Sequence, residues 1–310
     1  MPDSTIQILN DSKPITLITL LLAAIFFLIG CGKRETRVEW ANRHQILLKG
    51  SGTEPKDLDP HLATGVTEHH IIMSLLEGLV AEDPVDLHPV PGAAESWNIS
   101  PDGKVYTFHL RANAKWSNGD PVTARDFLDT YKRILTPTLA SEYAYMHFVV
   151  KNAEAFNTGR LKDFSQVGYK AIDDHTLEIT LENATPYFLS LLNHMSWFPV
   201  HVPTIAKYGK VYERGSKWTR PGHFVGNGPF TLDTWRVNNI ITVKKSPTYW
   251  DRDTVKLSEI RFYPIEDING EERAFRAGQL HVTETLPLAK IETYKREHPE
   301  VFSSGPYLGT

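Results

Sequence analysis

The feature that most constrains the fold of this chain is a charge-free apolar run at residues 15–30, ITLITLLLAAIFFLIG, which ends directly before the only cysteine. As a helix the run would measure about 24 Å, short of the ~30 Å hydrocarbon core of a bilayer, so its length favours a signal peptide over a spanning helix. Because Cys31 has no second cysteine to pair with, the 310-residue chain must fold without an internal disulfide or a multi-cysteine metal site.

The residues at the end of the run, Leu28-Ile29-Gly30-Cys31, resemble the lipobox of bacterial lipoprotein precursors. The resemblance implies cleavage before Cys31 and acylation of its thiol. A buried apolar cysteine at a helix end is the alternative that the residues leave open. Under the positive-inside rule, the basic residues that follow the run would place its C-terminal side in the cytoplasm. We give the lipobox-like sequence more weight than this rule, so we expect that side to lie outside the cytoplasm.

The composition of the chain is that of a globular protein, with 41% hydrophobic and 23% charged residues. The net charge of −4 and the lack of a basic patch argue against a nucleic-acid binder. Aromatic residues make up 11% of the chain, which fits either large hydrophobic cores or an aromatic-lined ligand cleft. The charged stretch after Cys31 has no hydrophobic periodicity, and it predicts a solvated tether.

From Ile46 onward, segments with strand periodicity alternate with segments of helical periodicity. The clearest helix begins at Thr123, with Asp126 three residues later as a capping box, and carries the apolar stripe Phe127, Tyr131, Ile134 and Leu135. Another helix is predicted in TGVTEHHIIMSLLEGLV, and strands are predicted in KVYTFHL, HTLEITL, PFTLDTW, NIITVKK and EIRFYPI. Without a strict βαβα order, this pattern predicts a mixed α/β fold with more than one sheet.

Positive signs of enzyme chemistry are lacking in the sequence. His69 and His70 are adjacent, so on a helix they point about 100° apart and cannot share an ion. The HExxH, GxSxG and P-loop patterns do not occur. Asp57 and Asp59 are predicted to cap backbone N–H groups in a loop. We therefore expect no catalytic residues, no metal site and no cofactor.

Several ordered segments together resemble a known family: GTEPKDLDPHLATGV, HPVPGAAESWNISPDGKVYTFHLR, AKWSNGDPVTARDF, NGPFTL, SPTYW and GPYLGT. They are similar to the extracytoplasmic solute-binding proteins of the oligopeptide class, which feed ABC importers. The resemblance covers the chain from about Ile46 to its last residue. It implies the type II-like clamp of the large oligopeptide-binding variety, whose two lobes close on a peptide held by its backbone.

The resemblance also implies a division of the chain into parts. Residues 1–30 would be the lipoprotein signal peptide and 31–45 the acylated cysteine with its tether. Residues 46–76 together with 202–310 would form a discontinuous first lobe, and 77–201 an additional inserted domain. The family continues after GPYLGT into the opposite lobe. We therefore expect a chain without the C-terminal lobe to bind oligopeptides about a hundredfold or more weakly than a full-length relative, because half a cleft holds a ligand poorly.

The resemblance carries ligand contacts over to six positions: Thr64, Gly65, Val66, Tyr143, Thr285 and Tyr307. Two positions depart from the family pattern. A peptide binder of the family has a glutamate where Thr64 stands, and the family has an acidic residue where His281 stands. Threonine at position 64 removes a carboxylate from the ligand surface, so the ligand preference of the family's peptide binder cannot be carried over to this chain from the resemblance alone.

These inferences predict the lipid-anchored substrate-binding component of an ABC importer, located outside the cytoplasm and held to the membrane through Cys31. Its expected partners are an oligopeptide, the permease and the ATPase, and it is expected to be a monomer that binds no nucleic acid. Two alternatives stay open. The same fold could bind a cell-wall peptide, a nickel chelate or an oligosaccharide, or the chain could be an envelope lipoprotein without a transport role.

Overall fold

The computed structural model describes residues 34–303, so the predicted signal peptide, Cys31 and Tyr307 lie outside the described residues. All named elements belong to the unit Arg37–Thr310. The α-helices are α2 Arg37–Arg43, α3 Val66–Leu75, α4 Ala124–Leu135, α5 Ala153–Asn157, α6 Phe188–Leu191, α7 Val202–Tyr208, α8 Ile268–Arg276 and α9 Ile291–Glu297. Within the described range, no helix has the length and apolar character needed to cross a membrane.

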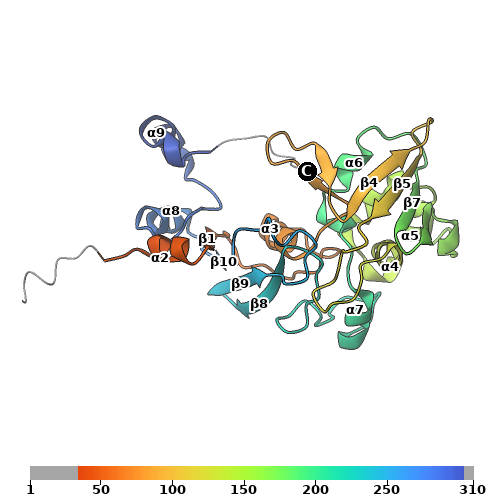
Figure 1. Cartoon of the computed structure of the whole chain (residues 1–310), viewed down its shortest axis with the longest axis horizontal. Helices are drawn as coiled ribbons and strands as arrows, with labels where there is room; N and C mark the ends of the chain where they lie inside the picture. The colour runs from red at the N-terminus through yellow and green to blue at the C-terminus, as the bar shows by residue number, and fades with distance from the viewer. Residues whose placement is uncertain (1–33, 304–310) are drawn as a thin grey trace, which may run out of the picture. The chain divides into compact units, whose positions relative to one another are not determined.

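Two four-stranded sheets and a short strand pair make up the β-structure (Figure 1). The first sheet has the order β1-β10-β9-β8, from β1 Ile46–Gly50, β8 Phe230–Arg236, β9 Ile240–Lys245 and β10 Glu259–Tyr263. The second has the order β4-β5-β7-β6, from β4 Ala94–Ile99, β5 Val105–Leu110, β6 Tyr169–Asp173 and β7 Thr176–Thr180. The pair is β2 Val80–Glu82 and β3 Pro89–Pro91. Among the strands named here, β1 and β10 run parallel and the other pairs are antiparallel.

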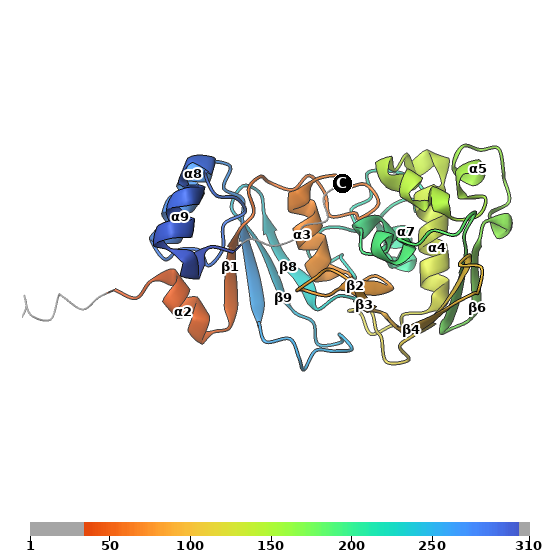
Figure 2. The ribbon, with the colours of Figure 1, turned by 90° about the horizontal axis from the view of Figure 1, so that it is seen from above.

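Helix α4 forms where the sequence predicts it. The backbone N–H of Thr123 donates to Asp126 Oδ2 at 2.7 Å, which completes the predicted capping box. The predicted stripe of Phe127, Tyr131 and Ile134 is fully buried. Figure 2 shows α4 beside the second sheet, against which this apolar face packs.

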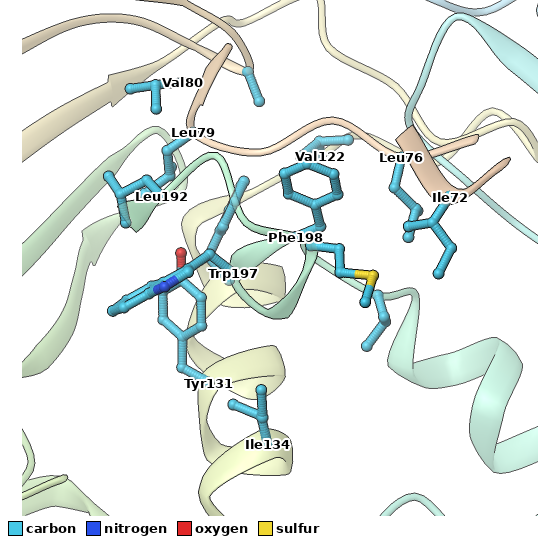
Figure 3. Close-up of a cluster of buried hydrophobic side chains, with 14 of the residues drawn as sticks. Ile72, Leu76, Leu79, Val80, Val122, Tyr131, Ile134, Leu192, Trp197 and Phe198 are labelled. Atoms are coloured by element: carbon cyan, nitrogen blue, oxygen red, sulfur yellow. The ribbon is translucent and has the colours of Figure 1, made fainter. Parts of the chain in front are cut away.

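The main hydrophobic cluster is continuous between the two sheets, because it contains Phe108 and Leu177 of the second sheet as well as Ile241 of the first. Part of it is drawn in Figure 3, where Phe198 lies between the side chains around α3 and the pair Trp197 and Tyr131. Three of the seven tryptophans are buried to 1% exposure or less: Trp116, Trp197 and Trp218. For these three, the structure supports the interpretation that aromatic residues fill the core.

The two sheets draw on different parts of the chain. Strands of the first sheet come from 46–50 and 230–263, whereas those of the second come from 94–180. The domain boundaries predicted at 76/77 and 201/202 stay a prediction, because the core is shared between the sheets.

The tether predicted for 31–45 is corrected at its C-terminal end, where α2 occupies Arg37–Arg43. The Val38 N–H donates to the Gly278 carbonyl at 2.9 Å, and Ala41 is buried in a small cluster with Leu48. A seven-residue helix that buries one side chain shows no apolar periodicity in the sequence. Its stability comes from packing against distant residues rather than from local propensity.

A buried ion pair joins the loop before α3 to α4. Arg133 Nη2 lies 2.6 Å from Asp59 Oδ2, and Arg133 Nη1 lies 3.0 Å from Asp59 Oδ1, in a two-pronged contact. The carboxylate also accepts the His61 N–H at 3.0 Å and the Trp218 indole N–H at 3.3 Å. Despite its burial, Asp59 therefore has a lowered pKa, because Arg133 and these N–H groups favour the charged form.

The buried pair predicts that two arginines of α4 contribute very differently to the free energy of unfolding. Replacing Arg133 with Met leaves the Asp59 carboxylate buried without its cation, and we expect a loss of about 3–5 kcal/mol in the free energy of unfolding. Arg125 pairs with Asp129 on the exposed face of α4, so Arg125→Met should cost less than about 1 kcal/mol. Urea denaturation of both variants measures the difference, and equal losses would contradict the structural role of the buried pair.

Candidate ligand-binding site

The segment Thr64–Val66 is an exposed stretch of main chain that leads into α3. Gly65 is the N-cap, with extended dihedral angles of φ −98° and ψ 154°. A Cβ at this position would lie 2.0 Å from Glu68 Oε2, and the Glu68 carboxylate is held in place by the Lys56 N–H, which donates to it at 2.8 Å. Glycine therefore allows the Glu68 carboxylate to pack closely against the main chain. Gly65 is half-buried, and Thr64 and Val66 on either side of it are exposed.

Tyr143, another residue that the resemblance assigns to the ligand site, lies against this segment. It comes from the 3₁₀ helix Glu142–Val149, and its hydroxyl donates to the Thr64 carbonyl over a long distance of 3.5 Å. The edge of its ring packs on His194, with ring centroids 4.5 Å apart. The structure thus brings together four of the six predicted ligand residues, Thr64, Gly65, Val66 and Tyr143.

Two histidines that the sequence analysis did not assign to the site complete this surface. His194 Nδ1 accepts the Ser196 N–H at 3.2 Å, and the His69 ring lies beside His194 with centroids 6.3 Å apart. Burial lowers the pKa of His194 to about 4, and it lowers the pKa of His69 as well. Both rings are neutral at pH 7, so they can donate and accept hydrogen bonds without adding a charge to this surface.

Thr285 is placed by a different set of contacts. The segment before it runs beside β1: the His281 N–H donates to the Leu48 carbonyl at 2.8 Å, and the Gly50 N–H donates to the Val282 carbonyl at 2.8 Å. Thr285 lines a pocket of about 330 Å³ together with its neighbours in 281–286, residues of α8 and α9, and residues 301–303. No contact between Thr285 and Tyr143 is found within residues 34–303.

The carboxylate of Glu284, the neighbour of Thr285, contacts two basic side chains, Lys49 and His70. It lies 2.5 Å from Lys49 Nζ and 3.2 Å from His70 Nδ1. Hydrogen bonds from His70 and Lys49 lower the pKa of Glu284 to about 2 despite burial. Thr285 is therefore tied to β1 and to α3 through Glu284, and the charges at this place compensate one another.

His281, the second departure from the family pattern, has a structural role. Its Nδ1 accepts the Leu48 backbone N–H at 2.9 Å, and its Nε2 lies 3.0 Å from Asn42 Oδ1. An acceptor at Nδ1 requires the neutral ring with its proton on Nε2. His281 thus joins α2, β1 and the segment that carries Thr285.

One group of possible metal ligands occurs in the described part of the chain: Asp83, Asp86 and His88, whose ligand atoms lie within 4.8 Å of one another. They belong to the turn between β2 and β3. Asp83 Oδ1 accepts the Val85 N–H at 2.8 Å, and His88 Nδ1 lies 2.5 Å from Asp86 Oδ1. These contacts within the turn account for the positions of all three side chains.

The residues that the sequence analysis missed lie far from their partners in the chain. His194 is 51 positions after Tyr143, and Glu284 is more than 200 positions after Lys49. No local motif marks either contact. The adjacent pair His69 and His70 is conspicuous in the sequence, but the two side chains contact different partners. His69 lies beside His194, and His70 lies beside Glu284.

Comparison with known proteins decides the family. Residues 88–310 match the family model described as bacterial extracellular solute-binding proteins, family 5 Middle. The chain belongs to this family. The match covers well over half of the sequence, and the predicted resemblance to solute-binding proteins of the oligopeptide class is confirmed.

Curated relatives within family 5 include the periplasmic oligopeptide-binding protein OppA of Escherichia coli, which is 41% identical over 269 residues. That alignment covers 86% of this chain and 48% of the relative. The oligopeptide-binding protein OppA of Bacillus subtilis is 36% identical over 285 residues, which cover 90% of this chain and 50% of the relative. The chain thus spans about half the length of the curated relatives it matches.

Solved structures agree with this assignment. The unliganded open form of the murein tripeptide-binding protein MppA matches with a TM-score of 0.77 and 33% identity, over 82% of this chain and 48% of that one. The Haemophilus influenzae OppA complex with the peptide RPPGFSPFR matches with a TM-score of 0.76 and 36% identity, with the same coverage. The predicted mixed α/β fold of the type II periplasmic binding proteins is confirmed.

The neutral state of His194 predicts a pH dependence of stability. Between its folded pKa of about 4 and its usual value of 6.5, the unfolded chain binds a proton that the folded chain does not. The free energy of unfolding should therefore fall as the pH falls through this window, by about 1–2 kcal/mol on account of this ring. Urea denaturation at several pH values should show a shallower fall for His194→Asn.

His88→Asn serves as the matched control for that measurement. The exposed His88 has a raised pKa because it donates to Asp86. Its contribution to the free energy of unfolding is therefore complete below its unfolded pKa and is lost only as the pH rises above that value. The His88→Asn variant should therefore have the same slope of stability against pH between pH 6.5 and 4 as the parent chain. A His194 variant with the slope of the parent chain would contradict the assignment of a neutral, partly buried ring.

Proposed function

We propose that this chain binds oligopeptides outside the cytoplasm, mainly through their backbone, and serves the permease and ATPase of an ABC importer. Several relatives are named as oligopeptide- or dipeptide-binding proteins, which supports the ligand class. The observation that carries the proposal is the position of Tyr143 against the exposed main chain at Thr64–Val66.

The geometry suits ligands that are recognised by their amides. The first turn of a helix leaves N–H groups without partners inside the helix, and α3 begins at the exposed Val66. A peptide in extended form could pair with this main chain in the manner of an added strand, whatever its side chains are. The neutral rings of Tyr143, His194 and His69 add surface without selecting a charge.

We also propose that Cys31 carries the lipid that holds the protein at the membrane. The support is the lipobox-like sequence Leu28-Ile29-Gly30-Cys31 at the end of the apolar run. An acyl anchor would keep the binding domain beside its permease.

Two alternatives differ in ligand rather than in fold. One relative is named as a murein peptide-binding protein, and the unliganded structure of a murein tripeptide-binding protein has a TM-score of 0.77 with this chain. A cell-wall tripeptide is therefore the second candidate. An envelope lipoprotein that transports no ligand is the other, and it would show neither peptide binding nor dependence on Tyr143.

A photo-crosslinking tripeptide tests the proposed contact. Alanyl-benzoylphenylalanyl-alanine should crosslink within residues 64–66 or at Tyr143, as mapped by mass spectrometry, and excess trialanine should compete for the site. We expect Tyr143→Ala to weaken binding about tenfold, the effect of losing a contact aromatic residue.

Tyr212→Ala is the matched control, because Tyr212 lies in the loop after α7 and contacts Lys132 rather than the site. It should bind the tripeptide like the parent chain. Crosslinks spread evenly over the surface, or an equal effect of the two tyrosine variants, would contradict the assignment. Competition by a murein tripeptide but not by trialanine would favour the second candidate.

The anchor has its own test in intact-mass measurement of the protein purified from bacterial membranes. We expect the mature N-terminus at Cys31 with the added mass of acyl chains, and recovery in the membrane fraction. Cys31→Ser should abolish both the added mass and the membrane recovery. A mature chain with a free thiol at Cys31 would contradict the proposed lipidation.

A further inference from the structure

A pocket of about 600 Å³ lies between α4 and β6, on a part of the chain that the proposed peptide site does not use. One wall is the exposed face of α4, and the other walls are β6 and the loop that carries the 3₁₀ helix Phe164–Gln166. Its lining residues are Arg125, Leu128, Asp129, Lys132, Phe156, Lys162, Asp163, Phe164, Ser165, Tyr169, Lys170 and Ala171. We call it the lysine pocket. Its volume lies within the range of small-molecule sites.

The apolar part of the lysine pocket is aromatic. The Phe156 and Phe164 rings meet edge to face with centroids 5.1 Å apart, and Phe164 stacks beside Tyr169 at 6.2 Å. Phe156 and Tyr169 are buried, whereas Phe164 and Leu128 are only partly covered. The partly covered side chains offer a flat apolar surface inside a cationic rim.

The lysines of the pocket have no anionic partner. Among residues 34–303, no ion pair or side-chain hydrogen bond involves the ammonium group of Lys132, Lys162 or Lys170. The Lys132 ammonium has a distant cation–π contact with Tyr212, at 6.0 Å from the centre of the ring. Both carboxylates of the pocket have hydrogen-bond donors other than the lysines. Asp129 accepts from Arg125 Nε at 3.0 Å, and Asp163 accepts from the Ser165 N–H at 3.0 Å and the Ser165 hydroxyl at 2.8 Å.

The pocket therefore carries two more cations than anions around an aromatic surface. Cations that line a concave apolar surface raise the local concentration of anions. A purely ionic ligand would leave the aromatic surface exposed to water. A purely apolar ligand would leave the ammonium groups without partners. Both features are satisfied by a molecule with an apolar body and one acidic group.

We propose that the lysine pocket binds a small amphiphilic organic anion, whose apolar body lies on Phe164 and Leu128 and whose acidic group is held by Lys132, Lys162 and Lys170. This site would be a second ligand site on the chain. It shares no residue with the surface formed by Thr64–Val66, Tyr143 and Thr285, so its ligand would not compete with a peptide.

The probe for the proposal is 8-anilinonaphthalene-1-sulfonate, an aromatic anion whose fluorescence rises on binding, and 1-anilinonaphthalene is the same body without the acid. We expect saturable binding of one sulfonate molecule per chain, weaker at high salt, and about tenfold weaker binding of the neutral analogue. The double variant K132Q/K170Q should lose about tenfold in affinity for the sulfonate and none for the neutral analogue.

The control is K207Q/K256Q, which removes two exposed lysines elsewhere and changes the net charge equally. It should bind the sulfonate like the parent chain. Acetylation of lysines, followed by mass spectrometry, locates the probe independently: the sulfonate should slow modification of Lys132, Lys162 and Lys170 but not of Lys207. Equal affinities of the two double variants, equal affinities of the two probes, or unprotected pocket lysines would overturn the proposal.

Discussion

The buried ion pair between Asp59 and Arg133 is the interaction on which the arrangement of the site depends. It fixes the loop before α3 to α4, and Asp59 also accepts the His61 N–H while its own carbonyl accepts the Ala63 N–H at 2.9 Å. Thr64 follows directly. A buried pair of this kind adds little stability over an apolar pair but is costly to break, so it specifies one position for the loop.

Around that fixed main chain, the histidine rings beside Thr64 add no charge, whereas the carboxylate beside Thr285 is paired with a lysine. The rings beside Thr64 are neutral because burial lowers the pKa of both His69 and His194. Beside Thr285, the Glu284 carboxylate pairs with the Lys49 ammonium and lies 3.2 Å from His70 Nδ1. A surface of this kind suits a ligand that is bound through uncharged amides, which is the basis of the proposed function. The lysine pocket, with its unmatched cations, has the opposite character.

Local features of the fold could be predicted from the sequence. The Thr123 capping box, the apolar stripe of α4 and the alternation in Leu177, Ile179 and Leu181 depend on residues within a few positions of one another. Asp57 caps the Leu58 and Asp59 N–H groups, as expected of a loop carboxylate.

Long-range features could not be predicted from the residues alone. The partner of Asp59 lies 74 positions away, and α2 is held by residues more than 200 positions later in the chain. The resemblance to the family pointed to Tyr143 and to Thr64 as ligand residues, but it did not predict that they lie side by side, because pairing at such distances leaves no periodic pattern in the sequence. Neither a periodic pattern in the sequence nor the resemblance to the family pointed to His194.

Amide hydrogen exchange at residues 64–67 tests the central claim, that the main chain at the start of α3 binds peptides by their backbone, most directly. The account predicts that trialanine, trilysine and triglutamate, each at saturating concentration, slow exchange of these amides to a similar degree. Exchange rates that stay unchanged with all three peptides, or that fall with only one charge type, would contradict it.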